Sequence, residues 1–126
     1  MIAEMSNVML LDTNAIIYFL GGNPTIVSLL DQKIHYASVI SEIEVLGFDF
    51  KTNADSYAVR RYLRSVRIIP LNNEIKKIAI DIKKNYKAKV GDAIISAAAI
   101  CFGLPFISAD KNFIKIKELN LVLFSL

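Results

Sequence analysis

Four short segments of the chain each place a carboxylate where a helix or a turn is expected to begin. These acids are Asp12, Glu44, Asp92 and Asp110. Carboxylates that meet at one point repel one another, and they coexist only when protons or a metal ion neutralise them. Oxygen-only ligation favours hard cations, and Mg²⁺ typically binds one or two carboxylates, several waters and the phosphates of a substrate. If the fold brings these acids together, the sequence predicts a Mg²⁺ site.

Each acid also has an ordinary structural role as an alternative. Asp12 suits the N-cap of the helix that follows it, and Ser41 with Glu44 has the spacing of a capping box. Asp92 could cap its own helix, and Asp110 could shape a turn. Asp92 is the hardest to explain in this way, because the helix that follows it carries no charge and is apolar on nearly every face.

The composition limits the other kinds of chemistry. His35 is the only histidine and Cys101 the only cysteine, so the chain offers no Cys/His cluster for zinc and no intrachain disulfide. No apolar stretch reaches the ~20 residues that a membrane span requires. Residues 1–6 lack the basic start of a signal peptide. We therefore expect a soluble protein of the reducing cytoplasm, with no membrane partner.

The basic residues are unevenly distributed, although the formal net charge is only +3. Ten of the fifteen lysines and arginines fall within residues 60–89, where only Glu74 and Asp81 oppose them. This bias suits a ligand with a phosphate backbone, although two solvated helix faces would give the same pattern. The candidates for contacts to such a backbone are Arg60, Arg61, Arg64, Lys84, Lys87 and Lys89.

Short apolar runs alternate with helical patterns along the chain, which predicts an α/β fold. We expect strands at residues 8–11, 34–37, 67–70, 105–108 and 121–124. We expect helices at residues 15–20, 25–30, 42–48, 54–66, 73–86 and 92–102. This order predicts one domain, residues 1–126, with a mostly parallel sheet of about five strands covered on both faces. Ligands of open α/β sheets bind at the carboxyl ends of the strands, where Asp12 and Asp110 are expected.

Four segments of the sequence resemble the PIN domain family, and VapC-type toxins of type II toxin–antitoxin systems in particular. The segments are residues 10–17, 40–48, 91–99 and 107–113, and they occur in the order typical of the family. The resemblance covers the chain from about residue 7 to its end. It implies a three-layer α/β/α sandwich and an endoribonuclease that depends on Mg²⁺ or Mn²⁺ and leaves 5′-phosphate and 3′-hydroxyl ends.

The resemblance also assigns roles to individual residues. Asp12, Glu44, Asp92 and Asp110 take the catalytic and metal-binding roles. Supporting polar roles fall to Thr13, Asn14, Ser41, Ser108 and Asn112. Many relatives carry a further acid where this chain has Asn112, so the binding of a second metal without substrate stays open. Glu42 and Glu44 point roughly 200° apart on a helix, and the spacing from Ser41 in the family selects Glu44.

The partners that the resemblance implies are an RNA substrate and an antitoxin protein. The hydrophobic share of 54% exceeds the usual ~45–50% of a globular domain and adds the expectation of a homodimer. Two alternatives stay open, namely a PIN nuclease with a role in RNA processing and a PIN-fold module that binds RNA or protein without cleaving. Asn14 argues against an Asp-x-Asp phosphatase, and no Gly-x-Gly-x-x-Gly turn supports a dinucleotide site.

Overall fold

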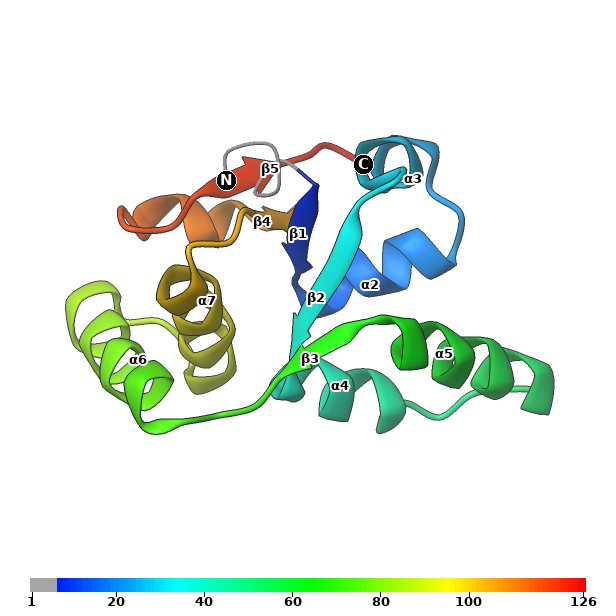
Figure 1. The fold of residues 1–126 in the computed structure, drawn as a ribbon, viewed down its shortest axis with the longest axis horizontal. Coiled ribbons are helices and arrows are strands. Elements are labelled where there is room, and N and C mark those ends of the chain that lie inside the picture. The colour runs from blue at the N-terminus through cyan, green and yellow to red at the C-terminus, as the bar shows by residue number, and fades with distance from the viewer. Residues whose placement is uncertain (1–6) are drawn as a thin grey trace.

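A five-stranded, fully parallel sheet forms the centre of the molecule (Figure 1). The structure is a computed structural model and describes residues 7–126; residues 1–6, on which the absence of a signal peptide was argued, lie outside the described residues. The strands are β1 (Val8–Leu11), β2 (Ile34–Ser38), β3 (Arg67–Ile69), β4 (Phe106–Ser108) and β5 (Leu121–Leu123). Their order in the sheet is β3-β2-β1-β4-β5, so β1 lies at the centre.

Helices cover both faces of this sheet. They are α2 (Thr13–Leu20), α3 (Pro24–Leu30), α4 (Val39–Leu46), α5 (Asn53–Ser65), α6 (Asn73–Tyr86), α7 (Val90–Phe102) and the 3₁₀ helix η1 (Lys111–Lys115). Side chains alternate across a strand, so Leu10 packs in the core that α6 and α7 share. Met9 and Leu11 pack in the core of α2, α3 and α5. The predicted three-layer α/β/α sandwich is therefore confirmed.

Five of the six predicted helices begin one to three residues earlier than the sequence pattern predicted, and two of these shifts change the role of a candidate acid. Helix α4 starts at Val39 rather than at residue 42, because Ser38 ends β2 and also caps α4 without an intervening loop. Ser41 therefore lies inside the helix, and the capping-box interpretation of Ser41 and Glu44 is wrong. Helix α7 starts at Val90, with Lys89 as N-cap residue, so Asp92 lies in the first turn and does not cap the helix.

Other boundaries agree with the sequence or differ from it by one or two residues. Helix α6 spans the predicted residues 73–86. The 3₁₀ helix η1 was not predicted, because five residues are too few to show a helical period. Among the described residues, no helix has the length and apolar character to cross a membrane.

Two buried serines, one that caps α4 and one inside α7, allow a matched test of the N-cap at Ser38. Ser38 is 1% exposed, and its hydroxyl accepts the Ile40 N–H at 3.1 Å. Ser96 in α7 is fully buried, and its hydroxyl has no hydrogen-bond partner among the described residues. Ser38→Ala should lower the free energy of unfolding by about 1 kcal/mol, the usual value of an N-cap. Ser96→Ala should not lower it, because it removes a desolvated, unpaired hydroxyl.

Urea denaturation of the parent and the two variants gives the comparison directly. Equal losses in both variants would mean that Ser96 is hydrogen-bonded in solution.

Candidate active site

Asp12 lies at the centre of the site because it directly follows the central strand, β1. It is 5% exposed, and one carboxylate oxygen, Oδ1, accepts the Ala15 N–H at 2.7 Å. The other oxygen, Oδ2, accepts a hydrogen bond of 2.5 Å from the Ser108 hydroxyl at the end of β4. The capping role that the sequence offered as an alternative is thus real, and the same carboxylate also faces the edge of the sheet where ligands bind.

Asp110 joins this group through Ser108. The backbone N–H of Asp110 donates to Ser108 Oγ at 2.9 Å. Oδ1 of Asp110 accepts the Asn112 N–H at 2.9 Å and caps η1. Asp110 therefore shapes a turn, which was the structural role suggested as an alternative. Its negative charge also raises the pKa of Asp12.

Glu44 is positioned by a threonine on the neighbouring helix. Thr13 Oγ1 lies 2.7 Å from Glu44 Oε1 and 3.0 Å from the hydroxyl of Ser41, which is fully buried. A carboxylate can only accept a hydrogen bond, so Thr13 donates to Glu44. Of the two glutamates of α4, Glu44 and not Glu42 makes this contact, which links α2 to α4 at the site.

The carboxylates act on one another electrostatically. The pKa of Asp12 is raised to about 6, chiefly by burial and also by the negative charges of Asp110 and Asp92, against the hydrogen bonds from Ser108 and Ala15 that lower it. Burial also raises the pKa of Asp92, with Asp110 and Glu44 adding to the effect and Lys89 and Lys115 opposing it. The four predicted acids therefore share one electrostatic environment at the carboxyl edge of the sheet.

The donor set fits a hydrated divalent cation. Within residues 7–126, no three side chains of His, Cys, Asp or Glu lie close enough to hold one ion between them. The oxygen-only set and the raised pKa values of Asp12 and Asp92 favour a hard cation that neutralises them. Mg²⁺ commonly binds through one or two carboxylates and otherwise through water. The residues present thus suit such an ion, with water completing its coordination.

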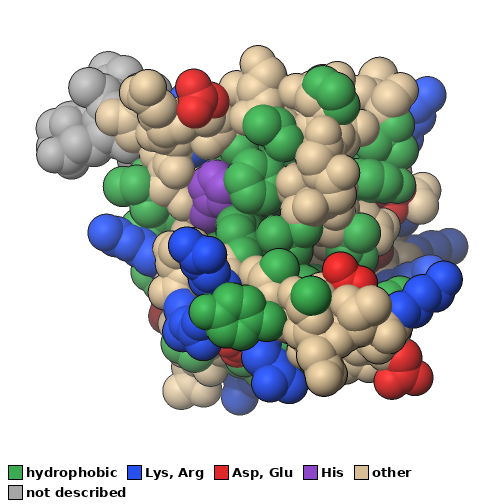
Figure 2. Space-filling model, turned by 90° about the vertical axis from the view of Figure 1, so that its right-hand side faces the viewer, with side chains coloured by type: hydrophobic (Ala, Val, Ile, Leu, Met, Phe, Trp, Pro, Cys, Tyr) green, Lys and Arg blue, Asp and Glu red, His purple; other side chains and the backbone are tan. Residues whose placement is uncertain are grey.

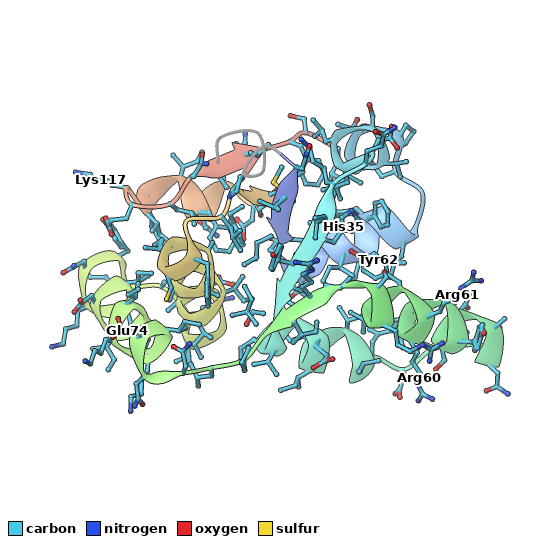
Figure 3. All side chains as sticks on the ribbon, viewed as in Figure 1. His35, Arg60, Arg61, Tyr62, Glu74 and Lys117 are labelled. Carbon is cyan, nitrogen blue, oxygen red and sulfur yellow. The ribbon has the colours of Figure 1, made fainter. Side chains whose placement is uncertain are left out.

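The remaining predicted residues lie in three different places. Lys87, Lys89 and Asn112 line a small cavity that also contains Asp92. Asn14 and Lys84 are exposed on α2 and α6. The arginines of α5, by contrast, lie across the molecule from α6 and α7, as Figure 3 shows for Arg60 and Arg61; Arg64 belongs to the same helix. The basic stretch of the sequence is therefore not one continuous surface.

One basic residue beside the candidate acids was not predicted from the sequence. Lys115, at the end of η1, lines the cavity beside Asp92, and its charge lowers the pKa of that acid. It lies outside the basic stretch of residues 60–89, and only the return of the chain through β4 and η1 brings it there. No pattern of local spacing could have indicated it.

The comparisons with known proteins agree with this architecture. The model of the PIN domain family matches residues 9–119. A toxin–antitoxin complex from Klebsiella pneumoniae shares 27% identity with a TM-score of 0.78, over 90% of this chain and 95% of that one. VapBC-1 from nontypeable Haemophilus influenzae shares 21% identity with a TM-score of 0.78, over 92% and 97%. VapBC2 from Rickettsia felis, bound to a promoter DNA fragment, shares 16% identity with a TM-score of 0.78, over 94% and 99%.

A comparison with curated protein sequences found no match. The family model covers most of the chain, and its span includes β2, β3, β4 and most of β1, together with the central Asp12 and the other three acids. The resemblance noted in the sequence is thereby confirmed, and the chain belongs to the PIN domain family.

Proposed function

We propose that this chain is a Mg²⁺- or Mn²⁺-dependent endoribonuclease of the cytoplasm, and that it is the toxin of a toxin–antitoxin pair. The observation that carries the proposal is the buried carboxylate of Asp12, fixed by Ser108 and Ala15 and surrounded by negative charge. Carboxylates whose pKa is raised by burial and by neighbouring charges are concentrated at functional sites. Membership of the PIN family and the solved toxin–antitoxin complexes of similar fold support the assignment.

The proposed reaction is hydrolysis of an RNA phosphodiester. A bound Mg²⁺ or Mn²⁺ would polarise a phosphate oxygen and lower the pKa of a bound water. Asp12 and Asp92 are the first candidates to hold the ion, directly or through water. Glu44, fixed by Thr13, and Asp110 would orient the attacking water. That water loses one proton to solvent as its oxygen bonds to phosphorus, the bond from phosphorus to the 3′ oxygen breaks, and the leaving oxygen takes one proton from solvent.

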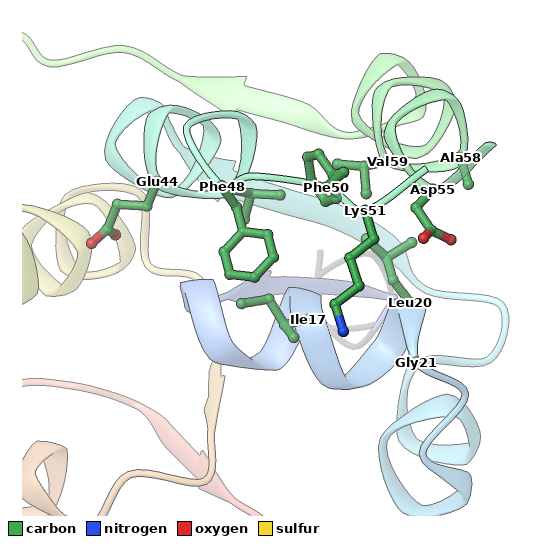
Figure 4. Close-up of a pocket in the computed structure, with 11 residues that line it drawn as sticks. Ile17, Leu20, Gly21, Glu44, Phe48, Phe50, Lys51, Asp55, Ala58 and Val59 are labelled. Atoms are coloured by element: carbon green, nitrogen blue, oxygen red, sulfur yellow. The ribbon is translucent and has the colours of Figure 1, made fainter. Parts of the chain in front are cut away.

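An apolar groove beside the site is the proposed location of the antitoxin. It lies between α2, α4 and α5, has a volume of about 410 Å³ and has Glu44 at one end and Lys51 and Asp55 toward the other (Figure 4). Its apolar walls are formed by Ile17, Leu20, Val45, Phe48, Phe50 and Val59. Apolar segments of a partner, usually helical, commonly bind in such grooves. The solved complexes of toxins with antitoxins support this choice of occupant.

We further propose that the chain forms a homodimer. The face of the molecule in Figure 2 carries many hydrophobic side chains around His35. The exposed apolar residues of α3 and β2 include Val27, Leu29 and Ile34, which are 39–40% exposed. Clustered apolar surface of this kind is typical of a surface that binds another protein. None of these three residues lines the proposed antitoxin groove, and we propose that both partners bind at once.

The nuclease proposal predicts a specific set of inactive variants. Asp12→Asn, Asp92→Asn and Glu44→Gln should each remove most cleavage of single-stranded RNA in Mg²⁺ or Mn²⁺, because each changes the charge or the geometry at the metal. Excess EDTA should abolish cleavage by the parent. Glu42→Gln is the matched control and should retain activity, since Glu44 is the acid that contacts Thr13. Gel analysis of labelled RNA measures all of these.

Two results would contradict the proposal. If Glu42→Gln is inactive and Glu44→Gln is active, Glu42 and not Glu44 is the acid of α4 that belongs to the site. Activity at the level of the parent in all four variants would place the cleavage elsewhere or in a contaminant.

The raised pKa values predict how stability depends on pH without metal. The ordinary pKa of Asp is about 4, and the pKa of Asp12 in the folded protein is about 6. Between these two pH values, the folded state binds protons more tightly than the unfolded state. The Asp12 contribution to the free energy of unfolding therefore falls as pH rises through this window. For the same reason, Asp92→Asn should be at least as stable as the parent at neutral pH, and its advantage should shrink toward pH 4.

Thermal melting with and without Mg²⁺ tests the same site. Mg²⁺ should raise the melting temperature of the parent by mass action, and that of Asp92→Asn by less. The pKa of His35 is lowered by burial and acts on stability in the opposite direction, but it is common to both proteins and cancels in their difference. Equal shifts with Mg²⁺ in the parent and the variant would argue against metal binding at Asp92.

The assembly proposal predicts two masses in light scattering. The chain alone should have twice the mass of one copy, and addition of the small protein encoded by the adjacent reading frame should increase it. Phe48→Ser should prevent that increase without changing the dimer, because Phe48 is 65% exposed in the groove. Phe102→Ser, at a site 53% exposed outside the groove, is the control. A monomer at micromolar concentration, or loss of the complex in both variants, would refute this arrangement.

A further inference from the structure

A small basic cavity adjoins the carboxylates on the side of α7 and η1. It has a volume of about 140 Å³ and contains Asp92 at its edge. Its polar lining otherwise consists of Lys87, Lys89, Lys115 and Asn112. We propose that this cavity binds the backbone phosphate next to the scissile one and so makes the enzyme act on polynucleotides. This inference rests on the proposed ribonuclease function and assigns to these four side chains the positioning of the substrate.

The floor of the cavity is apolar and its rim is charged. Ala88, Phe113 and Ile116 are buried, with exposed fractions of 6%, 3% and 3%. The lysines that precede and follow Ala88 are exposed, as are Asn112 and Lys115 beside the other two floor residues. The chain thus fixes the backbone of each segment through a buried residue and leaves the neighbouring polar side chains free to reach a ligand.

The loop between α6 and α7 is held in one shape by local hydrogen bonds. Lys83 Nζ donates to the carbonyl of Ala88 at 3.2 Å. Lys87 ends α6 in the left-handed conformation, with a φ of 54°, and its N–H donates to the carbonyl of Lys83 at 3.2 Å. The backbone that carries Lys87 and Lys89 is therefore organised before any ligand binds, which reduces the entropy lost on binding.

Charge and size together select a phosphate group as the ligand. Three ammonium groups and an amide supply the hydrogen-bond donors that phosphate oxygens accept. Lys89 and Lys115 both act on the carboxyl of Asp92, so they lie near the proposed reaction centre. The volume of 140 Å³ is below the ~300–1,000 Å³ of pockets that enclose drug-sized ligands, which suits a small ligand such as a phosphate group.

The double variant Lys89→Ala/Lys115→Ala tests this inference, with Arg60→Ala/Arg61→Ala as a control that removes the same charge from α5. Binding of a labelled single-stranded RNA oligonucleotide is measured against salt by fluorescence anisotropy in Ca²⁺. Loss of one neutralised phosphate should reduce the slope of log affinity against log salt by about 0.7 in the lysine variant. The slope should be unchanged in the arginine variant.

Cleavage kinetics give the second readout. The parent should cleave an oligonucleotide with a lower KM than a dinucleotide, which has only the scissile phosphate. At saturating Mg²⁺, which keeps Asp92 ionised, the lysine variant should raise KM for the oligonucleotide at least fivefold, keep kcat within twofold and leave cleavage of the dinucleotide unaffected. Lys115→Glu alone should raise KM for the oligonucleotide more than the double alanine variant does, because it introduces a negative charge.

The outcomes separate the two proposals. Normal salt slope and length preference in the lysine variant, with an active parent, would overturn the phosphate cavity and leave the nuclease intact. A smaller salt slope in the arginine variant alone would indicate that RNA binds along α5. That result would also overturn the proposed phosphate cavity. A parent that cleaves no RNA would refute the nuclease function, and the inference with it.

Discussion

The hydrogen bond between Asp12 and Ser108 joins the end of β1 to the end of β4 across the centre of the sheet. Burying a carboxylate costs free energy unless it is hydrogen-bonded or neutralised. Here the same carboxylate also caps α2, so its position fixes where the first helix leaves the sheet. Thr13, the first residue of that helix, in turn reaches Glu44 of α4. The geometry of the site therefore follows from one buried acid and its two hydrogen-bond donors.

Much of the fold followed from the sequence because the apolar periods are strong and turn residues separate them. Helix α6 shows this best, since Ile75, Ala79 and Ile82 are buried at helical spacing. The start of α4 did not follow, because Ser38 ends a strand and caps a helix with no loop between them. The short η1 has no period to detect. The errors thus fall where two elements join directly or where an element is very short.

Three of the four candidate acids follow a strand or lie in the first turn of a helix, so the sequence could indicate them. Glu44 instead lies in the last turn of α4, and only the resemblance to a known family selected it. The role of each acid in local structure was harder to foresee. Asp12 and Asp110 do cap their segments, whereas Asp92 does not. A capping role and a role in the site therefore do not exclude each other. Lys115 was missed because its distance from Asp92 depends on the tertiary fold. For the same reason the sequence did not show that the basic residues of α5 lie across the molecule from α6 and α7.

The separation of Asp12 and Ser108 in sequence has a consequence for synthesis of the chain. Their bond closes over 96 residues, and β4, which lies between β1 and β5, joins the sheet only after α7 has been made. Contacts of such long range form late in folding, and a growing chain emerges from its N-terminus. Until β4 has left the ribosome, Asp12 lacks its partner on that strand. The candidate site is therefore incomplete on a nascent chain until β4 has been synthesised and has paired with β1.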